Sequence, residues 1–418
     1  MQLPLLLYFM LCTIIFSFAV KLLPQFFLDK PNTRKKHLKA TPQFGGIVFS
    51  TIFLITIAVK NIAPDWFIYC GLITVLIGAL DDKYDLPWSI KLLIQLSIMF
   101  YISYTFWGDF NSIVFFNFSI PVSPFVLLII FSLWFIGVFN AVNLIDGLDG
   151  LAAGFIFLFC ISISIVFGNE IKMFSLYLSI LMLSFLLFNQ RSAKVFMGDS
   201  GSLFLGYFVA VLPLLQKTYD IDNYSSLDMT PFLILSSFLI ADTTRVFLTR
   251  LVSGKSPMDA DTIHLHHLIL QNSGSYLLTL FIIFFLSSIS GSLAYLNEIF
   301  SFNSLGMLIQ ISLLFLFILT PPAPTYVNFI WKYFKPFYIW QKENDLSNKS
   351  QSYEKTLMVS FFMMILCLFF LSNVYLELFN LSNALIFLIF LIFITFNLND
   401  KIIIPFVQIT ASILFLEI

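Results

Sequence analysis

The sequence predicts an all-α polytopic membrane protein, with about eleven core transmembrane helices and two or three further helices near the C-terminus. Of its 418 residues, 59% are hydrophobic and only 11% are charged, and the mean hydropathy is +0.94. Apolar runs of helix-spanning length recur along the chain. The polar segments between them are too short to build a soluble core, so we expect a single membrane-embedded unit.

The apolar runs place the elements in order. We expect spans near 3–23, 45–63, 66–80, 89–106, 122–139, 151–168, 171–188, 202–216, 230–249, 275–297, 304–320, 357–372, 381–398 and 402–416. The first run lacks a basic start and a small-residue cleavage site, so we expect a retained helix. We divide the chain into a core, 1–325, and an extension, 326–418, that starts with a basic segment.

Lysine and arginine gather on one side of the predicted spans. With the N-terminus outside, eighteen of them fall in the inside loops and helix ends, against three in the outside loops. Cytoplasmic loops are enriched in these residues, so we expect a periplasmic or extracellular N-terminus. All four histidines and the unusual polar stretches lie on the same inner side: Asp29–Gly46, Asp81–Trp88, Asn140–Gly150, Asn189–Ser202 and Arg250–Ser273.

The stretch Asn140–Gly150 holds two amides, two carboxylates and two glycines in eleven residues, between two apolar runs. A carboxylate at membrane depth costs several kcal/mol and marks a functional site by default. Glycines allow a backbone to approach a ligand closely. We interpret the stretch as a functional loop that joins two spans, and the alternative is a polar turn that only connects helices.

Adjacent carboxylates end the third span at Asp81 and Asp82, a pattern that suits a hard divalent cation or a base beside a metal. Acids at a helix C-terminus oppose the helix dipole, which favours function over a plain polar end. Lys91 follows one turn into the next span, where it could face an anionic lipid headgroup. The pair Gly45-Gly46 at another helix start could offer N–H groups to a phosphate, although the basic run before it also suits plain anchoring to headgroups.

Two further segments carry candidate ligands. A Gly-flanked Asp199 with nearby hydroxyls fits a magnesium or diphosphate site. The three histidines of His264-Leu-His-His267 suggest zinc, but no cysteine accompanies them, so contacts to phosphate or sugar with Arg245 and Arg250 are favoured. The four cysteines are scattered singly and predict buried thiols rather than a disulfide framework. The sequence has no basic stripe for nucleic acid.

These motifs resemble, in order and spacing, the polyprenyl-phosphate N-acetylhexosamine-1-phosphate transferase family (glycosyltransferase 4), and most closely its WecA branch, over roughly residues 1–325. The resemblance implies a cytoplasmic active site in a bacterial inner membrane. It also implies transfer of a sugar 1-phosphate, with GlcNAc-1-phosphate favoured, from a UDP-sugar to undecaprenyl phosphate. Release of UMP and a need for Mg²⁺, with Mn²⁺ as a substitute, follow from the same resemblance. The product would start O-antigen, teichoic acid or another cell-envelope polysaccharide.

The resemblance also assigns roles residue by residue. Asp81 and Asp82 match the acidic pair at the lipid phosphate, and Lys91 matches a basic residue there. Asp199 matches the metal-binding Asp, and Asn143 a residue beside the metal and diphosphate. The other matches concern the nucleotide, the uracil, or the phosphate and sugar: Asp146, Asp149, Asn189, Phe196, Arg245, His264, His266 and His267. Lys39 departs from the usual first loop, and the extension after residue 325 has no counterpart in the family.

Alternatives stay open at this point. The same reaction could use another UDP-N-acetylhexosamine, such as a 6-deoxy form, or a phospho-MurNAc-pentapeptide. A lipid-carrier transporter also places acids in a membrane, but its acids would gather at the midplane with an inverted repeat. The assembly is left as a monomer or a homodimer, and the role of the extension is left open.

Overall fold

The computed structural model describes residues 5–23, 28–29, 41–116, 118–219, 226–254 and 263–300. The contacts of the chain separate Cys12–Asn328 from a second unit, and every arrangement reported below lies within Cys12–Asn328. The expected spans after residue 300, the extension, His37 and Lys39 lie outside the described residues.

Helices make up most of the described chain, as predicted. They are α1 (Leu5–Leu22), α2 (Gly45–Val59), α3 (Asp65–Tyr84), α4 (Trp88–Thr105), α5 (Pro124–Ile145), α6 (Leu151–Val166), α7 (Asn169–Asn189), α8 (Asp199–Tyr219), α9 (Thr230–Leu235), α10 (Ser237–Val252), α11 (Leu265–Ser273) and α12 (Tyr276–Phe300). Within the described residues, five helices are long and apolar enough to cross a membrane, namely α1, α5, α7, α8 and α12. Helices α2 and α6 are apolar but shorter.

Short strands correct the expectation of an all-α chain. They are β1 (Leu28–Asp29), β2 (Thr41–Pro42), β3 (Ser112–Phe115), β4 (Phe118–Pro121) and β5 (Ser226–Asp228). The strands β3 and β4 form an antiparallel hairpin, and β5 joins β3 in parallel register. The segments that precede α5 and follow α8 are thereby held together.

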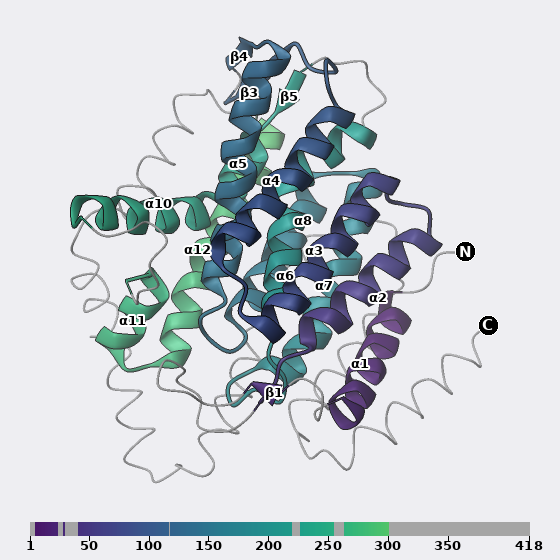
Figure 1. The fold of residues 1–418 in the computed structure, drawn as a ribbon, viewed down its shortest axis with the longest axis vertical. Helices are drawn as coiled ribbons and strands as arrows, with labels where there is room; N and C mark the ends of the chain where they lie inside the picture. Colours follow the sequence, from purple (N-terminus) through teal and green to yellow (C-terminus); the bar gives the residue numbers. More distant parts are fainter. Residues whose placement is uncertain are drawn as a thin grey trace. The chain divides into compact units, whose positions relative to one another are not determined.

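Helix α8 occupies the centre of the bundle, against α2, α3, α5 and α7 (Figure 1). Nearly all of its side chains between Leu203 and Leu215 are buried. Glycines permit the close crossings, because a Cβ at Gly206 would lie 2.4 Å from the Phe139 carbonyl oxygen of α5, and one at Gly78 would lie 2.3 Å from Ser200 Cα. Helix α8 is therefore held by close backbone contacts with α3 at its first turn and with α5 further along its length.

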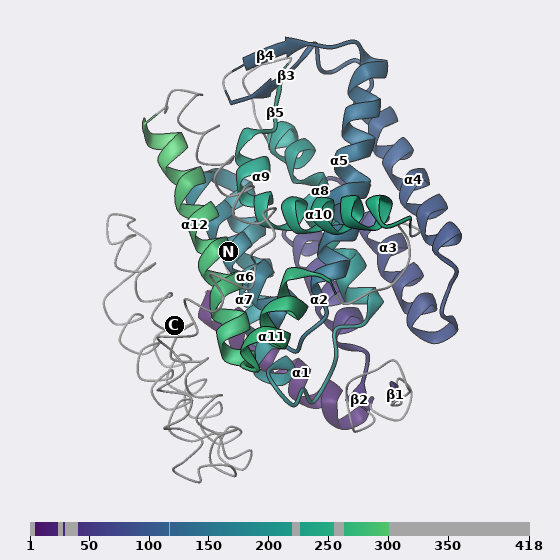
Figure 2. The same ribbon diagram turned by 90° about the vertical axis from the view of Figure 1, so that its left-hand side faces the viewer.

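The expected span 230–249 is not one helix. The chain breaks at Ser236, which separates α9 from α10, and α10 then runs across the direction of α5 and α8 (Figures 1 and 2). The sequence of α10 explains the difference, since Asp242, Thr243, Thr244 and Arg245 make its middle too polar for a lipid-facing span.

Candidate active site

Asp81, near the end of α3, forms an ion pair with Lys91 at the start of α4. Lys91 Nζ donates to the Asp81 carboxylate at 2.7 Å, and the Leu86 N–H donates to it at 2.8 Å. The Asp81 side chain is almost closed to solvent, whereas that of Lys91 is one quarter exposed. An ammonium has three donors, so the buried carboxylate holds Lys91 in place while the other N–H groups point elsewhere.

Asp82 turns away from its neighbour and caps the N-terminus of α8. Its carboxylate accepts hydrogen bonds from the Asp199 N–H at 2.7 Å and from the Ser200 N–H at 3.1 Å. The first N–H groups of a helix lack partners and carry partial positive charge, so an anion is favoured there. Gly198 has φ +74°, and a Cβ on it would lie 2.6 Å from the Asp82 carboxylate. The Asp199 side chain lies against Asp81, so Asp199 contacts both acids of α3, Asp81 through its side chain and Asp82 through its N–H group.

The N–H groups of Gly45 and Gly46 do not form an anion site, which was one of the two interpretations of this segment. The Gly45 N–H donates to the Phe196 carbonyl at 3.0 Å, and the Gly46 N–H donates to the Met197 carbonyl at 2.8 Å. A Cβ on Gly46 would lie 2.1 Å from Gly201 N. The two glycines therefore bring α2 against the segment that leads into α8, and both N–H groups are used in that contact.

The first half of the stretch Asn140–Gly150 is helical, not a loop as predicted, because α5 continues into it. Asn140 exchanges amide hydrogen bonds with Gln95 of α4, at 3.0 and 3.3 Å, which gives it a structural role. The Asn143 amide oxygen accepts from Ser202 Oγ at 2.5 Å. Ser202 thus fixes the orientation of Asn143 beside the first turn of α8.

The turn after α5 contains the two predicted nucleotide acids. Asp146 is only partly exposed, and loss of solvation, followed by the charges of Asp149 and Asp82, raises the pKa of Asp146 to about 7. Asp149 accepts a hydrogen bond from the Ala193 N–H at 3.2 Å. The Tyr276 hydroxyl at the start of α12 donates to the Asp149 carbonyl oxygen. The turn is thereby held between α12 and the segment that joins α7 to α8.

Asn189 fastens the same turn to the end of α7. Its amide oxygen accepts from the Gly150 N–H at 2.9 Å, and its amide nitrogen donates to the Val195 carbonyl at 2.9 Å. The side chain is 4% exposed. The amide oxygen and the amide nitrogen of Asn189 therefore both bind backbone groups. The contact of Asn189 with uracil stays a prediction.

The histidine segment lies over this turn. The His266 ring is buried and packs on Gly147, because a Cβ added to Gly147 would lie only 2.4 Å from His266 Nε2. The rings of His266 and His267 lie 4.1 Å apart between centroids. His264 and Arg245 both bind the Asp242 carboxylate, at 2.9 and 2.8 Å.

Most predicted site residues therefore come together around the ends of α3 and α5 and the start of α8. Phe196 holds α2 through its backbone and is half-buried. Sequence reasoning gave no individual role to three residues that orient the others, namely Asp242, Ser202 and Tyr276. An acid within a predicted span was a usable signal for Asp242, whereas nothing in the sequence pairs Ser202 with Asn143.

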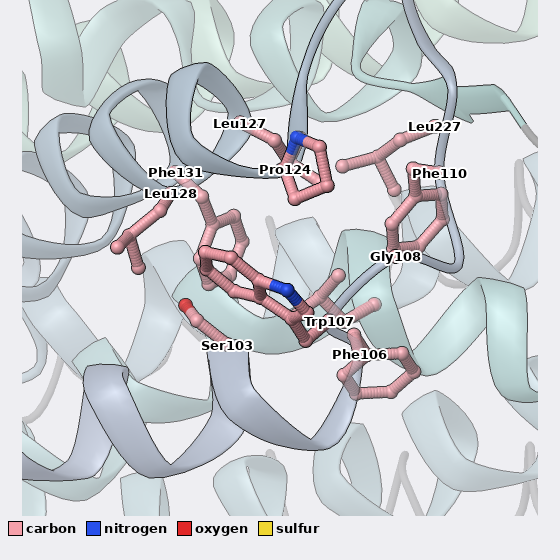
Figure 3. A pocket seen from close by; sticks show the side chains of 11 residues that line it. Ser103, Phe106, Trp107, Gly108, Phe110, Pro124, Leu127, Leu128, Phe131 and Leu227 are labelled. Atoms are coloured by element: carbon pink, nitrogen blue, oxygen red, sulfur yellow. The ribbon is translucent and has the colours of Figure 1, made fainter.

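A pocket lies elsewhere (Figure 3). It is formed where α4 ends and α5 begins, and its lining is mainly aromatic and aliphatic, with Phe106, Trp107, Phe110, Phe131 and Leu227 among its residues. Helix α5 has the pocket near its first residue and the acid cluster near its last. This pocket contains none of the predicted site residues.

Comparison with known proteins agrees with the motifs. Residues 66–217 match glycosyl transferase family 4. The chain is 35% identical to a probable undecaprenyl-phosphate N-acetylglucosaminyl 1-phosphate transferase of Bacillus subtilis, over 63% of this chain and 76% of the relative. It is 31% identical to an undecaprenyl-phosphate alpha-N-acetylglucosaminyl 1-phosphate transferase of Thermotoga maritima, over 69% and 88%. The enzyme of the same name from Escherichia coli K12 is 30% identical, over 63% and 74%.

Proposed function

Because this chain belongs to glycosyl transferase family 4, we propose that it transfers N-acetylglucosamine 1-phosphate from UDP-GlcNAc to undecaprenyl phosphate and releases UMP. The names of the relatives supply the substrates. One observation carries the proposal for this chain: the acids of α3, the end of α5 and the start of α8 converge, through the bonds of Asp82 to Asp199 and of Asn143 to Ser202. Two anions can be brought together at such a cluster only with compensating positive charge.

Lys91 supplies part of that charge on the acceptor side. Its side chain is partly exposed and its ammonium is held by the buried Asp81 carboxylate, so it can attract a lipid phosphate without losing its position. A phosphate monoester has its second pKa near 6 and is largely ionised at neutral pH. Asp81 and Asp82 therefore act mainly by positioning, Asp81 through Lys91 and Asp82 through α8, and a strong general base is not required.

The carboxylate and amide oxygens near the start of α8 fit Mg²⁺, with Mn²⁺ as a substitute. Within the described ranges, no group of three His, Cys, Asp or Glu side chains converges on one cation position. Mg²⁺ is commonly bound through one or two carboxylates, with waters and substrate phosphates completing its shell. Asp199 is the proposed ligand, with Asn143 beside it. When bound, the ion would neutralise charge on the diphosphate oxygens.

The remaining residues bind and orient the sugar nucleotide. The Asn143 amide, fixed by Ser202, directs its N–H groups towards the diphosphate. Asp146 and Asp149 border the nucleotide, in a turn whose backbone is fixed by Asn189 and Tyr276. The histidine segment and Arg245 contact the phosphate and sugar, and Phe196 lies beside the uracil. Each of these roles is carried over from the family motif.

The charge bias supports a cytoplasmic site in a bacterial inner membrane with the N-terminus outside. On this arrangement, residues 1–325 form the transferase core of about eleven spans, and residues 326–418 add a basic cytoplasmic segment and further helices. Deletion of residues 341–418, with transfer activity and membrane level measured separately, distinguishes a stabilising role from a dispensable one. Light scattering of the purified chain decides between monomer and homodimer.

The test is transfer by the purified full chain to undecaprenyl phosphate with Mg²⁺, followed as UMP release and as lipid-linked product. The donors are UDP-GlcNAc, its 6-deoxy analogues, other UDP-N-acetylhexosamines and UDP-MurNAc-pentapeptide. We expect UDP-GlcNAc to be preferred and D199N to abolish transfer, while the matched exposed-acid variant D109N keeps it. Absence of lipid-linked product from every donor would refute the function, and full activity of D199N would refute the metal assignment.

A further inference from the structure

Asp242, on α10, collects three donors from two segments of the chain. Its Oδ1 accepts from Arg245 Nη2 at 2.8 Å and from the Leu265 N–H at 3.0 Å, and its Oδ2 lies 2.9 Å from His264 Nδ1. The residue is 7% exposed. A carboxylate offers about four lone-pair sites, so it can accept all three bonds, and such charge-assisted bonds are among the stronger ones in proteins.

These bonds fix how α11 begins. The Leu265 N–H is the first amide of α11, and amides at this position lack a partner within the helix. His264 precedes the helix without a capping bond to it from its own side chain. Asp242 therefore caps α11 from another helix and holds the histidine ring at the same time.

The second anchor of the segment is the turn after α5. His266 follows two residues after His264 and is packed on Gly147. The rings of His264 and His266 lie 5.9 Å apart and nearly parallel. The segment is thus attached to α10 at one point and lies on the nucleotide turn at another, so the position of Asp242 sets where the histidines stand over that turn.

Two buried atoms in this cluster point to a ligand. Among the residues that the structure describes, His264 Nε2 and Arg245 Nε are buried and have no hydrogen-bond partner. Leaving a buried polar group unsatisfied is costly, so each such group in a native structure needs an explanation. Since the opposite ring nitrogen faces a carboxylate, His264 carries its proton on Nδ1, and Nε2 is the atom left for a substrate.

We propose that Asp242 is a positioning residue for the sugar nucleotide, which holds His264 in its Nδ1–H form and keeps Arg245 beside it. The inference rests on the proposed function, because His264 and Arg245 are there assigned to the phosphate and sugar. Asp242 itself touches no substrate and acts through its two neighbours. The carboxylate is required rather than an amide, because the amide nitrogen would present a donor where His264 needs an acceptor.

The variants D242N and D242A separate the two parts of this role. D242N keeps an oxygen for Arg245 and for the Leu265 N–H, but turns an N–H group towards His264 and so favours the opposite ring tautomer. D242A removes every acceptor. D228N is the matched control, because Asp228 also accepts a helix-start amide, from Thr230 at 2.8 Å, and takes no part in the site.

The experiment uses the purified full chain, with kinetics for both substrates and hydrogen exchange of the peptide 263–270. For D242N we expect kcat/KM for UDP-GlcNAc to fall roughly 10- to 100-fold, KM for undecaprenyl phosphate to stay unchanged, and exchange to match wild type. For D242A we expect the same kinetic loss together with faster exchange at the start of α11. D228N should behave as wild type in both measurements.

Wild-type kcat/KM in D242N would overturn the positioning role, and so would an equal loss in D228N. Unchanged exchange in D242A would overturn the attachment of α11 by Asp242. The exchange measurement needs no substrate, so it is decisive even for a wild-type chain that fails to transfer GlcNAc 1-phosphate. Such a failure would refute the proposed function, whereas the outcomes above refute the role of Asp242.

Discussion

Replacing Gly46 by alanine tests how closely the first turn of α8 must be held. The added Cβ would lie 2.1 Å from Gly201 N and 2.3 Å from Gly201 Cα, whereas ordinary contact begins at 3.4 Å. Both neighbours are backbone atoms, so no change of rotamer relieves the overlap. Helix α2 and the start of α8 must separate by about 1 Å, and overpacking of this kind costs about 1–3 kcal/mol.

The same displacement reaches the chemistry, because Gly201 lies two residues after Asp199. A misplacement of about 1 Å at an active site can reduce the rate by about 100-fold. We therefore expect G46A to unfold at a lower temperature and, at temperatures where it is folded, to transfer GlcNAc 1-phosphate about 100-fold more slowly. Thermal unfolding and steady-state transfer by the purified chain measure the two effects.

The matched control is G137A, also within a helix. A Cβ at Gly137 meets no atom within 4 Å, and alanine in a helix is more stable than glycine by about 0.5–1 kcal/mol. G137A should therefore keep its activity and unfold at an equal or higher temperature. Wild-type turnover in G46A, or an equal loss in G137A, would refute the reasoning.

Four further variants test the supports of the site. K91M leaves the buried Asp81 carboxylate without its ammonium partner. Because Lys91 is partly exposed, the loss of stability should be smaller than the roughly 3–5 kcal/mol expected for a fully buried pair. The double variant D81N/K91M should regain stability but should not regain transfer activity. N189A leaves two backbone partners unsatisfied and should cost about 1–3 kcal/mol for each in denaturant unfolding, so unchanged stability would contradict the bonds described. Loss of solvation raises the pKa of Asp146 to about 7 from its ordinary 3.8, so the contribution of Asp146 to the free energy of unfolding should fall as pH rises between these values. The difference in unfolding temperature between D146N and wild type, measured with EDTA, should therefore grow over that pH range. A difference that stays constant would argue against the raised pKa of Asp146.

The polar residues of the site could be predicted from sequence because their surroundings are apolar. Asp81, Asp82 and Asp199 stand out in a chain with so few charges, and Asp199 contacts the other two in the structure. Their individual partners could not be predicted. Successive residues of a helix point about 100° apart, so which acid faces α4 and which faces α8 depends on the rotation of α3, and hydropathy does not set that rotation.

Helix ends were predicted less well than helix positions. Hydropathy ended the fifth span at residue 139, although α5 continues to Ile145 because Asn140 and Asn143 find partners on α4 and α8. The break at Ser236 was missed because the apolar count of 230–249 is high. Gly45 and Gly46 were interpreted as donors to a ligand, but tertiary packing uses their N–H groups.

The bonds from the first amides of α8 to Asp82 join residues 117 and 118 positions apart. Ribosomes add about 5–20 residues per second, so the end of α3 is synthesised roughly 6 to 23 s before the start of α8. Throughout that interval the acidic end of α3 lacks the helix N-terminus that it later caps, and its carboxylate must stay hydrated at the membrane surface. Assembly of the site thus cannot precede the synthesis of α8, and a nascent chain that stops before residue 199 carries the acids of α3 without the helix start that they contact.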